Sequence, residues 1–357
     1  MCKKLAFYPM TRDTCAAARH LSLMQGYILT QLFVPAYMKL NRMDISSIDG
    51  GNFSSVSLTE YNKELISDLD TLFLEYDENI DDLSLYLEVV SDAEEMGKEI
   101  ILSRQLSEKI NKKTITWPED KPFVENPETD RLLDVQVPVV TVLSQGMYTD
   151  QFATELALRK NFLDAGYKVS QIGSREISRF FGFQSIPDFI YEHRDSYDLI
   201  LRFNRYVKEI VDSELPELLI IGVPGAIMKF NDRLLNGLGV LPFVISNAVR
   251  SDVSVMCMNF NQYKKETFEE MFMFGQYRLD SLIQFINIAN TSASPDVYMD
   301  NLKLNFTDLD SEFVLQNIQQ SMECGNYHVF NALDSESALN ACIAIQDKLA
   351  DNARYMR

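Results

Sequence analysis

VPVVTVLSQGMYTD, residues 137–150, is an apolar run rich in β-branched side chains that stops at a single glycine, Gly146. Apolar residues at helical spacing follow over 151–167. A short run at 168–175 comes next and, after a second helical stretch, the continuously apolar run 217–226. Buried-type strands that alternate with helices are typical of a parallel sheet with crossover helices. This stretch therefore predicts an α/β core.

Residues at the ends of these strands are the candidate ligand-binding residues. Ligands of parallel sheets bind beyond the carboxyl ends of the strands, so we expect the three strand ends to converge on one crevice. The candidates are Gly146, Met147, Tyr148 and Asp150 after the first strand, Arg175 after the second, and Gly222, Pro224 and Gly225 in the third run. These positions supply no complete catalytic set, so we predict no catalytic residue and no metal site.

The loop after the first strand occupies the position of a phosphate-binding P-loop. In that motif, GxxxxGK[ST], backbone N–H groups wrap the phosphates, and Lys and Ser or Thr reach phosphate and Mg²⁺. Residues 145–151 read QGMYTDQ, with one glycine and no lysine, and Asp150 is expected to cap the next helix where a phosphate would lie. The run 217–226 ends without Asp or Glu to hold Mg²⁺. We therefore expect no cofactor; binding of ATP or GTP by this degenerate loop is the alternative.

The chain is predicted to form two domains. Strand and helix patterns alternate over residues 1–105 as in a Rossmann-like half-fold, but its first strand-to-helix turn has no glycine for a dinucleotide. Residues 106–136 hold three prolines and many charges and are predicted as the linker. Residues 137–357 are predicted to form the second, degenerate P-loop-like domain. The fold class is thus α/β, with two domains of mainly parallel sheets, and the further apolar runs 239–249 and 253–260 are predicted as strands.

Composition indicates which classes of binding partner and which cellular compartment fit this chain. The formal net charge of −19 argues against a nucleic-acid partner, because phosphates would be repelled. Five cysteines without a CxxC pair, and only three histidines, do not predict a zinc site or a disulfide framework. No run has the length of a signal peptide core or of a membrane span. We predict a cytoplasmic protein with no membrane partner.

An acidic stretch suggests a second surface. Residues 60–99 carry 14 carboxylates against only Lys63 and Lys98. A solvated helix face is the simple interpretation. Docking of a basic partner segment is the functional interpretation.

Several segments resemble a known family. They are LAFYPM at 5–10, DTLFLEY and GKEIILS at 70–76 and 97–103, KNFLDAGYKVSQIGSREISRFFGFQSIPDF at 160–189, and ELLIIGVPGAIMKFND at 217–232. Together they are similar to peptide maturation system proteins of clostridial-type natural-product gene clusters, which lie near Cys-rich precursor peptides and radical SAM maturases. The resemblance covers nearly the whole chain and implies no catalytic residues. At Gly146–Tyr148 this chain departs from the family's more glycine-rich loop, in the direction of losing nucleotide.

Two functions remain as hypotheses. The resemblance implies a non-catalytic accessory protein in the maturation of a ribosomally synthesised peptide. Its partners would be the precursor peptide, the radical SAM maturase or both, held at the crevice or at the acidic face. The alternative is a nucleotide-dependent enzyme or switch.

Overall fold

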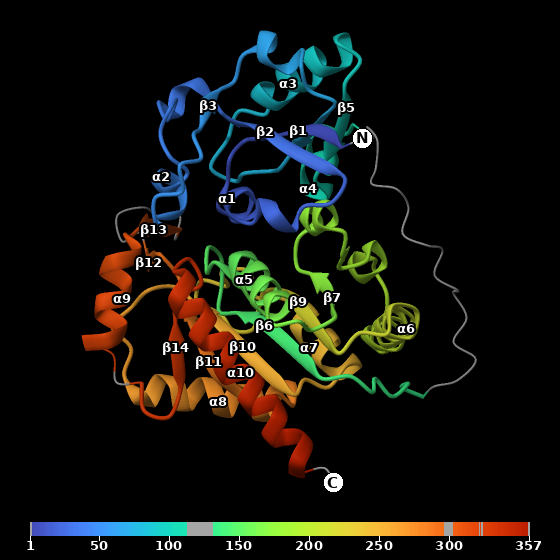
Figure 1. Ribbon diagram of the computed structural model, residues 1–357, viewed down its shortest axis with the longest axis vertical. Helices are drawn as coiled ribbons and strands as arrows, with labels where there is room; N and C mark the ends of the chain where they lie inside the picture. The colour runs from blue at the N-terminus through green and yellow to red at the C-terminus, as the bar shows by residue number, and fades with distance from the viewer. Residues whose placement is uncertain (1, 113–130, 296–302, 321, 323, 356–357) are drawn as a thin grey trace. The chain divides into compact units, whose positions relative to one another are not determined.

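The computed structural model describes residues 2–112, 131–295, 303–320, 322 and 324–355 (Figure 1). The chain divides into two compact units. The first is Met1–Pro122 with Arg179–Gly182, and the second is Phe123–Ser178 with Phe183–Arg357. Each unit has its own mainly parallel sheet with helices, which confirms the predicted α/β class. The predicted limits 1–105, 106–136 and 137–357 stay a prediction, since most of the linker lies outside the described residues.

The first unit contains a five-stranded sheet in the order β3-β2-β1-β4-β5, with every pair parallel. Its strands are β1 Lys3–Tyr8, β2 Tyr27–Val34, β3 Thr59–Glu60, β4 Thr71–Leu74 and β5 Glu99–Leu102. Its helices are α1 Arg12–Arg19, α2 Ser46–Asp49, α3 Ser84–Glu95 and α4 Arg104–Ile110, with short 3-10 turns η1 Leu21–Leu23, η2 Ala36–Met38 and η3 Lys63–Ile66. Helix α4 begins at a Ser103 cap and continues into the stretch predicted as linker.

Segment Arg179–Gly182 joins the first unit although it lies far along the chain. The Gln25 N–H donates to the Phe180 carbonyl at 2.8 Å. The Phe180 ring packs against Phe7 and Phe73, with centroids 5.7 and 5.4 Å away. These contacts bury a large aromatic side chain that the sequence places in the second domain.

A buried ion pair joins α1 to α2. Arg19 donates from Nε and Nη2 to the two carboxylate oxygens of Asp49, at 2.6 and 2.7 Å. Asp49 is only 1% exposed and also accepts from the Gly51 N–H. A Cβ at Gly51 would lie 2.5 Å from Arg19 Nη2, so glycine leaves room for the guanidinium. Bidentate geometry and extra hydrogen bonds are what a buried pair needs to offset its desolvation.

The second unit contains a seven-stranded, all-parallel sheet in the order β14-β11-β10-β6-β9-β7-β8. Its strands are β6 Val139–Ser144, β7 Val169–Gly173, β8 Gln184–Ser185, β9 Leu218–Ala226, β10 Val253–Met258, β11 Ile283–Ile288 and β14 His328–Phe330. The helices are α5 Gln151–Asp164, α6 Ser196–Glu214, α7 Leu241–Ala248, α8 Lys265–Leu279, α9 Ser311–Gln320 and α10 Ser335–Tyr355, with the 3-10 turn η5 Asp188–Tyr191. The 3-10 turn η4 Glu176–Phe181 begins in this unit and ends in the segment Arg179–Gly182 of the first unit. An antiparallel ribbon, β12 Thr291–Pro295 with β13 Leu304–Asp308, follows β11.

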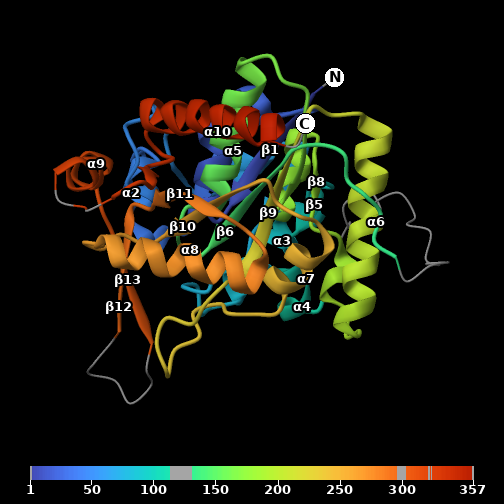
Figure 2. The ribbon, with the colours of Figure 1, turned by 90° about the horizontal axis from the view of Figure 1, so that it is seen from below.

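Helices cover both faces of this sheet (Figure 2). Every residue of β6 is buried, and its side chains alternate between two apolar clusters, as a strand covered on both faces requires. Val140 and Val142 pack in the cluster that includes α5 and α10. Val139 and Leu143 pack in the cluster with α6, α7 and α8.

The predicted strand at 239–249 is wrong. Residues 241–248 form α7, with Pro242 in its first turn. Its buried residues Val244, Ile245 and Ala248 recur at helical spacing on one face. A short apolar run fits a buried helix as well as a strand, which is why periodicity did not distinguish them.

We predict that Arg19→Ala destabilises the first unit by about 3–5 kcal/mol, because it leaves the Asp49 carboxylate buried without its cation. Urea unfolding, with hydrogen exchange in α1 and α2 as the local readout, measures this. The control is Lys160→Ala, which removes an exposed pair with Asp164 on α5 and should change stability by less than about 0.5 kcal/mol. Equal effects of the two substitutions would contradict the assignment.

Candidate functional site: the carboxyl edge of the central sheet

The path of the chain reverses at β6. From β6 the chain passes through α5 to β7, which lies beyond β9, and after β9 it passes through α7 to β10 on the other side of β6. In parallel sheets such a switch point marks where ligands bind, beyond the carboxyl ends of the strands. The loop 145–150 between β6 and α5 lies at this point. We call this loop, with the ends of β9, β10 and β11, the carboxyl edge.

Backbone N–H groups of the loop donate to side chains of the same unit. The Gly146 N–H donates to Ser144 Oγ at 3.1 Å. The Met147 N–H donates to Asn236 Oδ1 at 3.3 Å. A phosphate-binding loop needs such N–H groups to point at the ligand. Here both donors are already used.

Asn236 lies directly against Gly146. A Cβ at Gly146 would be 1.8 Å from Asn236 Nδ2. The Asn236–Gly237 turn is left-handed, with φ of 50° and 81°, and the Ala226 N–H donates to the Gly237 carbonyl at 2.9 Å. Glycine at position 146 therefore leaves room for the Asn236 carboxamide.

Two further asparagines hold the carbonyl side of the loop. Asn259, just after β10, donates from Nδ2 to the carbonyls of Met147 and Tyr148, both at 3.1 Å. Asn287 in β11 donates from Nδ2 to the Thr149 carbonyl at 3.1 Å and accepts from the Ala332 N–H at 2.8 Å. We call Asn236, Asn259 and Asn287 the amide brace. Sequence reasoning missed it, although an Asn directly after or inside an apolar run was a usable signal.

Asp150 does not cap α5 as expected. Its side chain makes no capping hydrogen bond, and its own φ is 55°. The carboxylate instead accepts from the Asn290 N–H at 2.9 Å, just after β11. This bond ties the start of α5 to the neighbouring strand end.

The antiparallel ribbon is joined to the loop by an aromatic contact. The Tyr148 ring packs edge-on against Phe306 of β13, with centroids 4.7 Å apart. The Phe260 N–H donates to the Thr291 carbonyl at the root of the ribbon, at 2.7 Å. Among the described strands, β12 and β13 pair only with each other, so the outer edge of each carries backbone groups outside any ladder.

Gly225, like Met147, lies at the Asn236–Gly237 turn. Gly225 has φ of 84°, and a Cβ there would be 3.4 Å from the Gly237 carbonyl. A Cβ at Gly237 would be 3.7 Å from Met147 Cγ. Pro224 lies between Val223 and Gly225 where the β6–β9 register shifts, between the pairs Val142–Gly222 and Ser144–Ala226.

The other two candidates lie apart from this turn. Gly222 is inside β9, opposite Val142. Arg175 is exposed just after β7, and β9 separates that strand from β6. Convergence of Arg175 with the loop stays a prediction.

Gly222 makes room for a buried carboxylate. A Cβ there would lie 2.2–2.4 Å from the carboxylate atoms of Glu155, a fully buried residue of α5. Glu155 Oε2 accepts from the Ser174 N–H at 3.0 Å. One turn later, Arg159 donates to the Val169 carbonyl and lies over the Phe183 ring, and burial lowers its pKa to about 10. Sequence reasoning missed both charged residues.

The carboxyl edge has few groups for covalent or metal chemistry. Within the described part of the chain, no three His, Cys, Asp or Glu residues lie close enough together to hold a metal ion. The Cys257 thiol at the end of β10 is fully buried, donates to Thr154, and has its pKa raised mainly by burial. A thiol held protonated is a poor nucleophile.

Comparisons with known proteins show the fold. No protein-family model and no curated protein matches the sequence. A DUF1611 family protein from Anabaena variabilis has a similar structure, with a TM-score of 0.62 at 9% identity, covering 96% of this chain and 99% of that one. This likeness agrees with the two-unit α/β architecture and shows nothing about function.

Two ligases match less well. A pseudomurein peptide ligase type C from Methanothermus fervidus gives a TM-score of 0.27 at 11% identity, covering 71% of this chain and 37% of that one. Helicobacter pylori folylpolyglutamate synthetase gives 0.26 at 14%, covering 59% and 54%. Scores this low do not indicate a shared fold.

Among the described residues, no helix is both long and apolar enough to cross a membrane.

We predict that Gly222→Ala destabilises the protein by about 1–3 kcal/mol, because the new methyl group collides with the Glu155 carboxylate. Adding Glu155→Ala removes the collision, so the two substitutions should be non-additive by about 1 kcal/mol or more in a double-mutant cycle. Chemical denaturation of the four proteins measures this. Strict additivity would show that Gly222 has some other role.

Proposed function

We propose that this protein is an accessory protein in the maturation of a ribosomally synthesised natural-product peptide. It binds the precursor peptide, the radical SAM maturase or both, without catalysis of its own. The observation that carries the proposal is the closure of the loop 145–150. Its Gly146 and Met147 N–H groups and its carbonyls bond to side chains of the same unit. Two backbone donors at the edge where an α/β protein normally binds a nucleotide are therefore already bonded within the protein.

A polypeptide suits the remaining features of this edge. The ribbon β12–β13 carries backbone groups outside any ladder, and an extended peptide can add a strand to such an edge. The Tyr148–Phe306 contact fixes the ribbon to the carboxyl edge. The resemblance to peptide maturation system proteins supplies the class of partner, and the net charge of −19 favours a basic segment.

The acidic face of the first unit is the second candidate surface. Its carboxylates are partly paired: Lys63 bridges Asp92 and Glu95, and Lys112 pairs with Glu94. This pairing reduces the charge available to a partner and favours the carboxyl edge.

The alternative function is nucleotide binding. The position of the loop at the switch point favours it, since P-loops occupy that place. Asp150, which adds a like charge at the start of α5, disfavours it. So does the absence of lysine from residues 145–151.

We predict that Mg²⁺-ATP and Mg²⁺-GTP bind no tighter than about 1 mM, that is, with no more than about 4 kcal/mol of binding free energy. Isothermal titration calorimetry measures this. Micromolar affinity that is lost on substitution of Gly146 would contradict the proposal and establish the alternative.

We predict that the precursor peptide encoded in the same gene cluster binds to this protein at low salt. Fluorescence anisotropy of the labelled peptide measures the affinity. Tyr148→Ala should weaken binding about tenfold or more, because it releases the ribbon from the loop, a loss of roughly 1.4 kcal/mol. Leu339→Ala, at an exposed apolar residue of α10, is the matched control and should leave the affinity unchanged.

Weaker binding at higher ionic strength would fit steering by charge. Failure of both the peptide and the maturase to bind at low salt would contradict the proposal. If both bind and Tyr148→Ala has no effect, the carboxyl edge is not the binding surface.

A further inference from the structure

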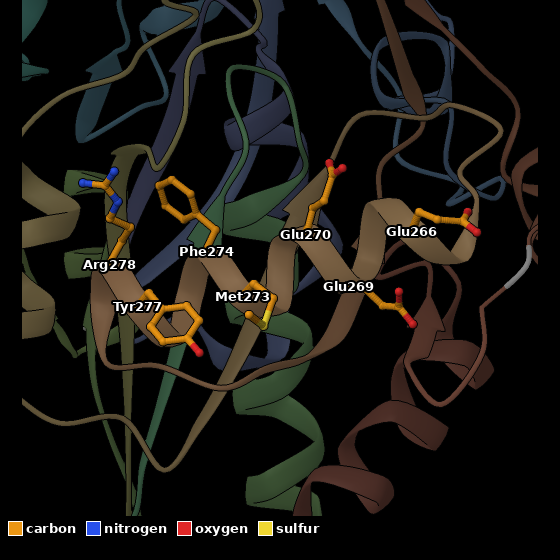
Figure 3. A pocket seen from close by; sticks show the side chains of 7 residues that line it. All are labelled: Glu266, Glu269, Glu270, Met273, Phe274, Tyr277 and Arg278. Carbon is orange, nitrogen blue, oxygen red and sulfur yellow. The ribbon is translucent and has the colours of Figure 1, made fainter.

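The outward face of α8 carries a shallow groove of about 540 Å³ lined entirely by residues of that helix (Figure 3). The lining residues form two rows with a spacing of four: Glu266, Glu270, Phe274 and Arg278 in one, and Glu269, Met273 and Tyr277 in the other. Rows with this spacing are the ridges that a second helix packs between. We call these seven residues the α8 face.

Two apolar side chains of the α8 face, Met273 and Tyr277, lie outside the core, whereas Phe274 is partly buried against it. The inward face of the helix is made of Phe268, Met271, Gly275 and Leu279, all buried. Tyr277 is 72% exposed and Met273 is 46% exposed on the opposite side. Exposed apolar residues grouped beside charged ones are typical of an interaction surface.

Charges on the α8 face are separated along the helix. Glu269 pairs with Lys265 at 3.1 Å. Three charged residues of this face make no ion pair with any described residue. Glu266 and Glu270 lie in the first half of α8, and Arg278 lies at its end. Phe274 lies midway between Glu270 and Arg278, four residues or about 6 Å along the axis from each.

The charges of one α8 face are complementary to those of a second, antiparallel copy. If a second α8 runs antiparallel to the first, with a two-fold axis near Phe274, Glu270 of each copy faces Arg278 of the other. Met273, Phe274 and Tyr277 then pack across the axis. Contacts of this reciprocal kind are what two-fold dimer interfaces contain.

We propose that the protein forms a two-fold homodimer through antiparallel packing of α8 against α8. The surroundings can extend the contact beyond one helix pair, because a stable interface buries about 800 Å² on each partner. Phe243 on the neighbouring α7 is 47% exposed, and Leu282, just after α8, is 40% exposed. The inference does not depend on the proposed function, because the α8 face is separate from the loop 145–150.

Charge reversal tests the geometry. Sedimentation velocity over a range of concentrations should show a dimer for the unmodified chain. Glu270→Arg or Arg278→Glu alone should weaken dimerisation at least about tenfold, because each places like charges opposite each other twice. The double substitution restores both pairs and should return the dimer.

Mixing the two single variants tests the pairing of Glu270 with Arg278 most directly. One variant then carries two arginines and the other two glutamates at positions 270 and 278, so the mixture should form a heterodimer that neither forms alone. Asp347→Arg, an exposed position of α10 without an ion pair, is the matched control and should leave dimerisation unchanged.

A monomer at all concentrations would overturn the proposal. A dimer that persists in both single variants would also overturn it, because the contact would then use another surface. If neither the double substitution nor the mixture recovers the dimer, the two copies do not meet with Glu270 opposite Arg278. Circular dichroism of each variant checks that the overall helix content of the protein is unchanged.

Discussion

The amide brace determines what the carboxyl edge of the second unit can do. Asn236, Asn259 and Asn287 reach the loop between β6 and α5 from three different segments and bond to both its N–H and carbonyl groups. Backbone polar groups near a sheet edge must be paired with protein, ligand or water. In a phosphate-binding loop the ligand supplies the partner; here side chains supply it. These bonds tie the loop to three segments of the same unit.

The glycines at this edge follow from the same constraint. Gly146 admits the Asn236 carboxamide, and Gly222 admits the Glu155 carboxylate. Glycine in a loop after a parallel strand is commonly associated with a close approach of phosphate. In this chain, close approach of the protein's own polar side chains accounts for Gly146 in the loop and for Gly222 inside β9, which is why the glycine pattern alone did not identify a ligand.

Much of the fold could be predicted from the sequence, and little of the site. Continuous apolar runs such as 139–144 and 218–226 predicted buried parallel strands, because a strand covered on both faces needs apolar residues at every position. The run 239–249 became a helix, since a short apolar run has no distinguishing period.

The amide brace depends on contacts between residues about 90 to 140 positions apart, such as Met147 with Asn236 and Thr149 with Asn287. Local sequence can mark an asparagine at a strand end, but it does not show which distant backbone groups that side chain bonds. The cap of α5 was predicted from local preference alone, which favours Asp150. In the structure its carboxylate instead accepts from the Asn290 N–H, which is distant in sequence.

The central claim is that the Gly146 and Met147 N–H groups are bonded within the protein. Residue-resolved NMR hydrogen exchange without ligand tests it most directly. The account predicts that both amides are protected, because an internally bonded N–H exchanges only on local opening, and that Mg²⁺-ATP leaves their rates unchanged. Unprotected exchange that becomes slow only when nucleotide is added would contradict it.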